Sequence, residues 1–131
     1  MKITKAHIAK VVKNGNWIIR FDDAGVSYNG FKSNALGEWT EAPDWNTKPE
    51  CGGGLHGQDK DNGGFKTNNI RLVFCETEGI HIPIDNDKVK VKKFKILLIN
   101  ELPKLSFSGS LDLSGCTGLT SLSELSVGGS L

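Results

Sequence analysis

The turn at Pro49–Gly57 carries the residues best suited to chemistry, because a cysteine, three consecutive glycines and a histidine lie together there. Glycine adopts positive φ without steric penalty, and successive backbone N–H groups in such a turn can surround an anion. His56 would then act as a hydrogen-bond donor or a base. One hypothesis is a ligand site formed by Gly52, Gly53, Gly54 and His56, loosely similar to an ADP-ribosyl or nucleotide pocket. The other is a tight turn in which His56 caps a carbonyl group, since no P-loop or G-x-G-x-x-G motif is present.

A metal site is a second hypothesis for Cys51 and His56, together with a cysteine and a histidine further along the chain. Four residues separate Cys51 from His56, and five separate Cys75 from His81, so two cysteines and two histidines form a chemically sensible zinc set. These spacings differ from those of common zinc motifs, and Cys75 lies in an apolar stretch. The simpler expectation is reduced thiols, with no metal or other cofactor.

Acidic residues give no clear sign of catalysis. Glu76 and Glu78 follow an apolar segment, a position from which a carboxylate can act as a general acid or base. A solvated turn fits the same pattern. No two acids show a spacing typical of paired catalytic carboxylates, so we expect no catalytic residue and favour a protein without enzymatic activity.

Lysines alternate with valines at Lys88–Lys95, which contains five lysines. In a strand, Lys88, Lys90 and Lys92 would share one face, because side chains alternate with a period of two. That face would suit nucleic-acid phosphates. Lysines also protect edge strands from unwanted pairing. We favour the edge strand, because the formal net charge of the whole chain is only +1.

A long segment rich in Gly, Asn, Asp and Pro, residues 25–66, predicts an ordered loop anchored by aromatic rings. Trp39 and Trp45 are its candidates for contact with a partner protein, or for stacking on a base. Before this loop, residues 5–13 fit either a helix or a strand. We prefer the strand, turning at Asn14-Gly15 into a second strand at 17–21.

Residues 70–100 have the most regular pattern. Residues 70–75 and 80–84 predict strands, and Pro83 should place the second of them at an edge or a bulge. The apolar phase then shifts between Val91 and Phe94. This shift predicts a bulge or a break near Lys92-Lys93.

The carboxyl-terminal part contains an internal repeat. Residues 102–111 return twenty positions later as residues 122–131, with six of ten positions identical. A fixed period predicts a solenoid, in which each coil buries its apolar edge against the next. We therefore expect a mainly β front domain at 1–100, followed at 101–131 by the first one to two coils of a leucine-rich-repeat-like solenoid, with an open edge at Val127–Leu131.

Composition indicates the cellular compartment. The chain has 131 residues, three cysteines, and neither a long apolar run nor an apolar leader. We therefore expect a cytoplasmic protein with reduced thiols and no membrane segment. A net charge near zero argues against nucleic acid as a general partner.

Two parts of the chain resemble known families. Residues 102–131 are similar to leucine-rich arrays frequent in phage and bacterial reading frames, with Cys116 at the Asn/Cys position. Residues 19–100 resemble a family of uncharacterised bacterial and phage domains through Glu41–Asn46 and Pro49–Gly57. The resemblance implies a fold and a phage or bacterial context but no activity.

Three functions follow from these patterns. The first, which we prefer, is a protein-binding module that uses Trp39, Trp45, Val127 and Leu131. The phage context implies one role for such a module in host cytoplasm, the inhibition of a defence complex. The second is a small-ligand or nucleotide site at Cys51–His56, and the third is a nucleic-acid contact at Lys88–Lys95.

Overall fold

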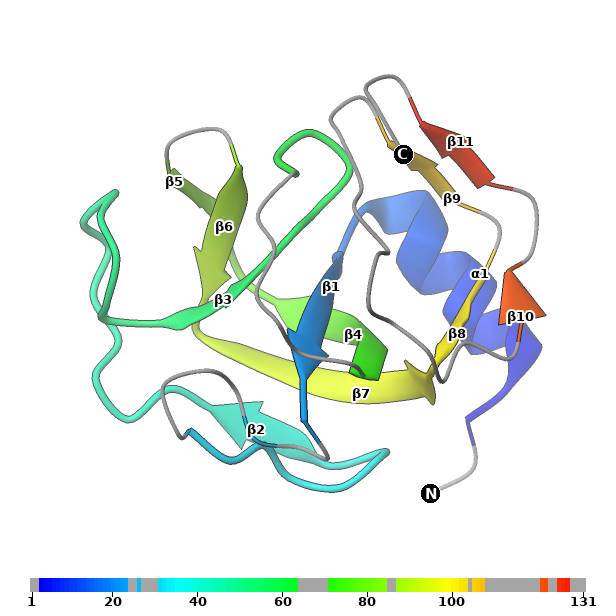
Figure 1. Ribbon diagram of the computed structural model, residues 1–131, viewed down its shortest axis with the longest axis horizontal. Coiled ribbons are helices and arrows are strands. Elements are labelled where there is room, and N and C mark those ends of the chain that lie inside the picture. Colours follow the sequence, from blue (N-terminus) through cyan, green and yellow to red (C-terminus); the bar gives the residue numbers. More distant parts are fainter. Residues whose placement is uncertain are drawn as a thin grey trace.

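Strands dominate the architecture (Figure 1). The computed structural model describes residues 3–23, 26, 31–63, 71–84, 87–103, 105–107, 121–122 and 125–127. The elements in chain order are α1 (Lys5–Asn14), β1 (Trp17–Asp22), β2 (Trp39–Glu41), β3 (Leu55–Gly57), β4 (Arg71–Glu78), β5 (Ile82–Ile84), β6 (Lys88–Val91), β7 (Lys93–Ile99), β8 (Glu101–Leu102), β9 (Leu105–Phe107), β10 (Ser121–Leu122) and β11 (Leu125–Val127). The expectation of a mainly β protein is confirmed.

The first element is a helix, so the preferred prediction of a hairpin at 5–13 is wrong. The Thr4 hydroxyl caps its start by accepting a hydrogen bond from the His7 backbone N–H at 3.1 Å. Gly15, at φ 74°, ends the helix in the left-handed conformation and donates back to its last turn. Ile8 and Val11 face the core. The Asn14-Gly15 pair is therefore a helix terminus and not a hairpin turn.

A four-stranded antiparallel sheet in the order β1-β4-β7-β2 forms the centre. All six residues of β1 are buried, because both faces of the sheet are covered. One face packs on α1 through a cluster that includes Trp17 and Phe74. The other packs on the second sheet through a cluster that includes Ile18 and Phe94. In Figure 1, α1 and the strands β3, β5 and β6 lie on opposite sides of the central sheet.

The second sheet has three strands in the order β3-β6-β5. Its edge strand β5 contains Pro83, as the sequence predicted. The predicted break near Lys92-Lys93 is also confirmed, because β6 ends at Val91 and β7 begins at Lys93 in the other sheet. The prediction of an edge strand at Lys88–Lys92 is wrong, since β6 lies between β3 and β5.

The loop predicted at 25–66 is more regular than expected. It contributes β2 to the central sheet and β3 to the second sheet. Both strands have three residues, too short for a periodic pattern to identify them. Phe31 and Trp45 pack on the second core cluster, so aromatic rings do anchor the described part of this segment.

The carboxyl-terminal strands pair in parallel. β8 pairs with β10, and β9 pairs with β11. Every paired position is offset by twenty residues, as in Leu102 with Leu122 and Leu105 with Leu125. Leu102 and Leu105 are buried in the cluster that contains α1, so the core crosses the expected domain boundary at residue 101. Cys116 and Leu131 lie outside the described residues.

Candidate functional site

The glycine turn has the conformation that the sequence suggested. Gly52 and Gly53 have φ values of 88° and 66°. A Cβ on Gly53 would collide with the side-chain amide of Asn46, and the positive φ disfavours most other residues, so glycine suits this position best. The Gly53 N–H donates to the Asp44 carboxylate at 3.3 Å. An anion in this turn would therefore meet a carboxylate already bound to one of the N–H groups that it needs.

Lys90 fills the other side of the turn. Its side chain is fully buried, and its ammonium donates to Asn46 Oδ1 at 2.8 Å and to the Gly52 carbonyl at 3.0 Å. A Cβ on Gly54 would lie 3.1 Å from this side chain. Lys90 therefore stabilises the turn from within, and its burial contradicts the hypothesis that the face of Lys88, Lys90 and Lys92 contacts phosphate through all three lysines. Lys90 cannot reach a nucleic-acid phosphate.

His56 lies in β3 beside buried positive charge. Its Nε2 is buried and has no hydrogen-bond partner among the described residues. Burial lowers the pKa of the imidazole, and the charges of Lys88, Arg20 and Lys90 act in the same direction. Burial and these charges therefore favour the neutral form of the ring. Its backbone carbonyl accepts a hydrogen bond from Arg20, so β3 is fixed to β1 at this point.

The four residues of the zinc hypothesis do not form a ligand set. Cys51 is exposed in the turn, whereas Cys75 is fully buried in β4, where burial raises the pKa of its thiol to about 12. His81 has other partners. Among the residues that the structure describes, no group of three or more His, Cys, Asp or Glu side chains is placed to hold a metal ion.

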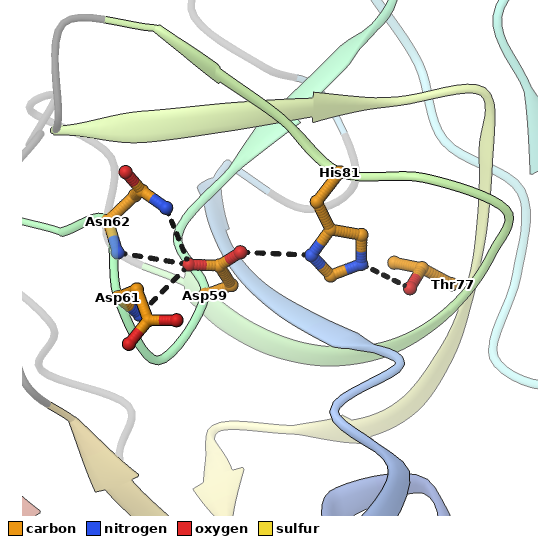
Figure 2. Close-up of polar contacts among 5 residues, drawn as sticks. All are labelled: Asp59, Asp61, Asn62, Thr77 and His81. Atoms are coloured by element: carbon orange, nitrogen blue, oxygen red, sulfur yellow. Dashed lines mark hydrogen bonds and ion pairs between the residues drawn. The ribbon is translucent and has the colours of Figure 1, made fainter.

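A hydrogen-bonded chain of three side chains, which the sequence did not predict, joins Thr77, His81 and Asp59 (Figure 2). Thr77 Oγ1 lies 2.7 Å from His81 Nε2, and His81 Nδ1 lies 3.0 Å from Asp59 Oδ2. The other carboxylate oxygen accepts from the backbone N–H groups of Asp61 and Asn62, both at 3.0 Å, and from the Asn62 side chain at 3.1 Å.

Hydroxyl, imidazole and carboxylate in this order are the arrangement that activates a nucleophile. Thr77, however, is only 3% exposed and pairs with buried Phe94 of β7. A substrate carbonyl cannot approach its hydroxyl. These hydrogen bonds between side chains instead connect the turn at Asp59–Asn62 to β4. No local signal reveals it, because Asp59 is 22 residues from His81.

The acids that follow the β4 apolar stretch are used in ion pairs. Glu76 lies 2.8 Å from His7 Nε2 and 3.8 Å from the Lys95 ammonium. Glu78 lies 3.3 Å from the Lys93 ammonium. These contacts connect α1 and β7 to β4 and give the two acids a structural role.

The candidate partner residues occupy different places. The ammonium groups of Lys93 and Lys95 lie 4.9 Å and 4.7 Å from the centre of the Trp39 ring, which is a cation–π arrangement. Trp45 lines a cavity of about 260 Å³ at the ends of β2 and β4. Val127 belongs to β11, and Leu131 lies outside the described residues.

Comparisons with family models, curated proteins and solved structures found no match. The resemblances noted from the sequence therefore stay predictions. Among the described residues, no helix has the length and apolar character needed to span a membrane.

Proposed function

We propose that this chain is a protein-binding module in which a mainly β front domain supports coils of a leucine-rich-repeat-like solenoid. The observation that carries the proposal is the constant twenty-residue offset in two separate parallel strand pairs. That offset equals the period of the sequence repeat. Stacked coils of a solenoid pair in this way, since equivalent residues of successive coils lie side by side.

The front domain provides a base for the first coil. Leu102 and Leu105 are 2% and 4% exposed, and they pack in the cluster that contains Ile8 and Val11 of α1. About three repeats are usually needed for a stable solenoid. Burial of the first coil against a folded domain replaces part of the contact that neighbouring coils would supply.

The contact surface in this proposal is the outer edge of β10 and β11. Within the described residues, each of these strands pairs with one other strand. An unpaired strand edge presents N–H and C=O groups that accept a further polypeptide strand. The partner is therefore a protein strand, from a second copy of the chain or from another protein. Inhibition of a host defence complex is one role such a contact would serve.

Substitution of Ser126 by lysine in β11 tests the edge directly, because a lysine on an edge strand discourages pairing. Ser106→Lys is the matched control, since Ser106 is the register partner of Ser126 one strand inward. We expect Ser126→Lys to reduce self-association in size-exclusion chromatography with light scattering, or capture of a protein from host lysate, more than the control does. Equal effects of the two variants, or a strict monomer that captures nothing and has a fully protected C-terminus by hydrogen exchange, would contradict the proposal.

A further inference from the structure

A small cavity with mixed lining lies where three strands end. The residues that line it include two acids, Glu41 and Glu78, two lysines, Lys92 and Lys93, and the apolar residues Trp45 and Ile80. The cavity volume is about 260 Å³. Because pockets for drug-sized ligands have volumes of about 300–1,000 Å³, only a small molecule fits here.

The charges in this cavity are only partly used by the protein. The Lys93 ammonium lies 3.3 Å from Glu78 Oε1 and 4.9 Å from the centre of the Trp39 ring. Within the described part of the chain, Glu41 and Lys92 take part in no ion pair with another side chain. Their backbones are close in space, because Glu41 pairs with Lys93 in the β2–β7 register and the Ala42 N–H donates to the Lys92 carbonyl at 2.8 Å. One negative and one positive group therefore remain available in the same cavity.

Apolar surface is exposed beside these charges. Ile80 is 61% exposed, the highest value among the large hydrophobic residues that the structure describes as exposed. Trp45 is half-buried and also packs against the second core cluster. A ligand side chain between Trp45 and Ile80 would remove apolar surface of both residues from water.

We infer that this cavity binds a small zwitterionic α-amino acid with an apolar side chain. The ligand ammonium pairs with Glu41, its carboxylate pairs with Lys92, and its side chain lies between Trp45 and Ile80. Both charges of the ligand are thus matched, while a neutral apolar molecule would leave Glu41 and Lys92 without partners. The site is separate from β10 and β11, so it does not depend on the proposed solenoid contact.

L-Leucine is a suitable probe, and chemical-shift titration by NMR detects binding even at millimolar affinity. We expect saturable shifts at residues 41–47, 78–80 and 92–93. N-Acetyl-L-leucine lacks the ammonium and L-leucinamide lacks the carboxylate, so each should bind more weakly than L-leucine. Because exposed ion pairs contribute at most about 1 kcal/mol, each loss should raise Kd about two- to fivefold.

Variants assign each charge to its residue. Glu41→Gln should weaken binding of L-leucine but not of N-acetyl-L-leucine, and Lys92→Met should weaken binding of L-leucine but not of L-leucinamide. Glu50→Gln and Lys10→Met remove exposed charges outside the cavity and should leave Kd unchanged. Equal affinity for L-leucine and its two derivatives, shifts in another region, or no saturation at tens of millimolar would overturn the inference.

Discussion

Asn100 and Leu72 are joined by two hydrogen bonds at the point where the central sheet leads into the carboxyl-terminal strands. The Asn100 backbone N–H donates to the Leu72 carbonyl at 2.7 Å, and the Leu72 N–H donates to Asn100 Oδ1 at 3.1 Å. Asn100 has a φ of 55°, the left-handed conformation that asparagine tolerates better than most residues. This pair fixes the direction in which the chain leaves β7 and enters β8.

Asn100→Ala should lower the free energy of unfolding by about 1–3 kcal/mol, because the N–H of fully buried Leu72 loses its acceptor. Asn100→Asp keeps a side-chain oxygen and should retain most of the stability, whereas Asn100→Gly keeps the conformation and loses the acceptor. Urea unfolding monitored by tryptophan fluorescence measures all three. Equal stability of the alanine and aspartate variants would show that the side-chain bond does not matter.

Leu105→Ala should cost about 2–5 kcal/mol, since Leu105 is 4% exposed and belongs to the core cluster on the α1 side. We also expect faster hydrogen exchange in β9 and β11, because β9 loses its contact with the core cluster that contains α1 residues. Ile80→Ala is the control, and at 61% exposure it should change stability by no more than about 0.5 kcal/mol. A small effect at Leu105 would mean that the core cluster does not stabilise β9.

Lys90→Met should loosen the glycine turn. The variant leaves the Gly52 carbonyl and Asn46 Oδ1 without the ammonium donor, which disfavours the folded turn. Removal of a buried charge offsets part of this loss, so global stability should fall by less than about 3 kcal/mol.

The backbone N–H of Asn46 donates to the Gly53 carbonyl at 2.8 Å. Its hydrogen exchange should be at least about tenfold faster in Lys90→Met. A tenfold change requires the free energy of local opening to fall by only about 1.4 kcal/mol. Lys92→Met removes an exposed lysine of the same segment and should leave that amide unaffected. Unchanged exchange in Lys90→Met would exclude a role of Lys90 in the turn.

Asp59 should make stability depend on pH in the acid range. Burial by itself would raise the pKa of this carboxyl, but hydrogen bonds from His81, Asn62 and the Asp61 N–H outweigh it and hold the pKa below the ordinary value of 3.8. A depressed folded pKa contributes stability that is present above 3.8 and is lost as the pH falls through the folded pKa.

Asp59→Asn should therefore be less stable than the wild type at pH 6, and the difference should shrink below pH 3.8. Chemical unfolding at a series of pH values measures this difference. Glu50→Gln removes an exposed carboxylate, and at pH 6 its free energy of unfolding should be within about 0.5 kcal/mol of the wild-type value. A constant difference between wild type and Asp59→Asn across the whole range would contradict the assignment.

The sequence alone determined the features that depend on local pattern. Alternation of apolar residues predicted strands at 70–75 and 80–84, where the structure has β4 (Arg71–Glu78) and a shorter β5 (Ile82–Ile84). Pro83 predicted an edge, and the phase shift near Lys92 predicted the break between β6 and β7. The repeat at 102–131 implied a twenty-residue offset, which the strand pairs have. These signals are readable because side-chain period and turn chemistry act over a few residues.

Only the tertiary structure decided the rest. Residues 5–13 satisfy both a helix and a strand pattern, and the helix between the Thr4 cap and Gly15 buries Ile8 and Val11 in the core cluster on the central sheet. Lys90 has the sequence context of an exposed strand lysine, yet it is buried because the distant residues Asn46 and Gly52 supply oxygen acceptors for its ammonium. The hydrogen bonds that join Asp59, Thr77 and His81 likewise depend on residues that are distant in the sequence. Contacts between residues far apart in sequence depend on how the sheets pack, and local pattern carries no information about that packing.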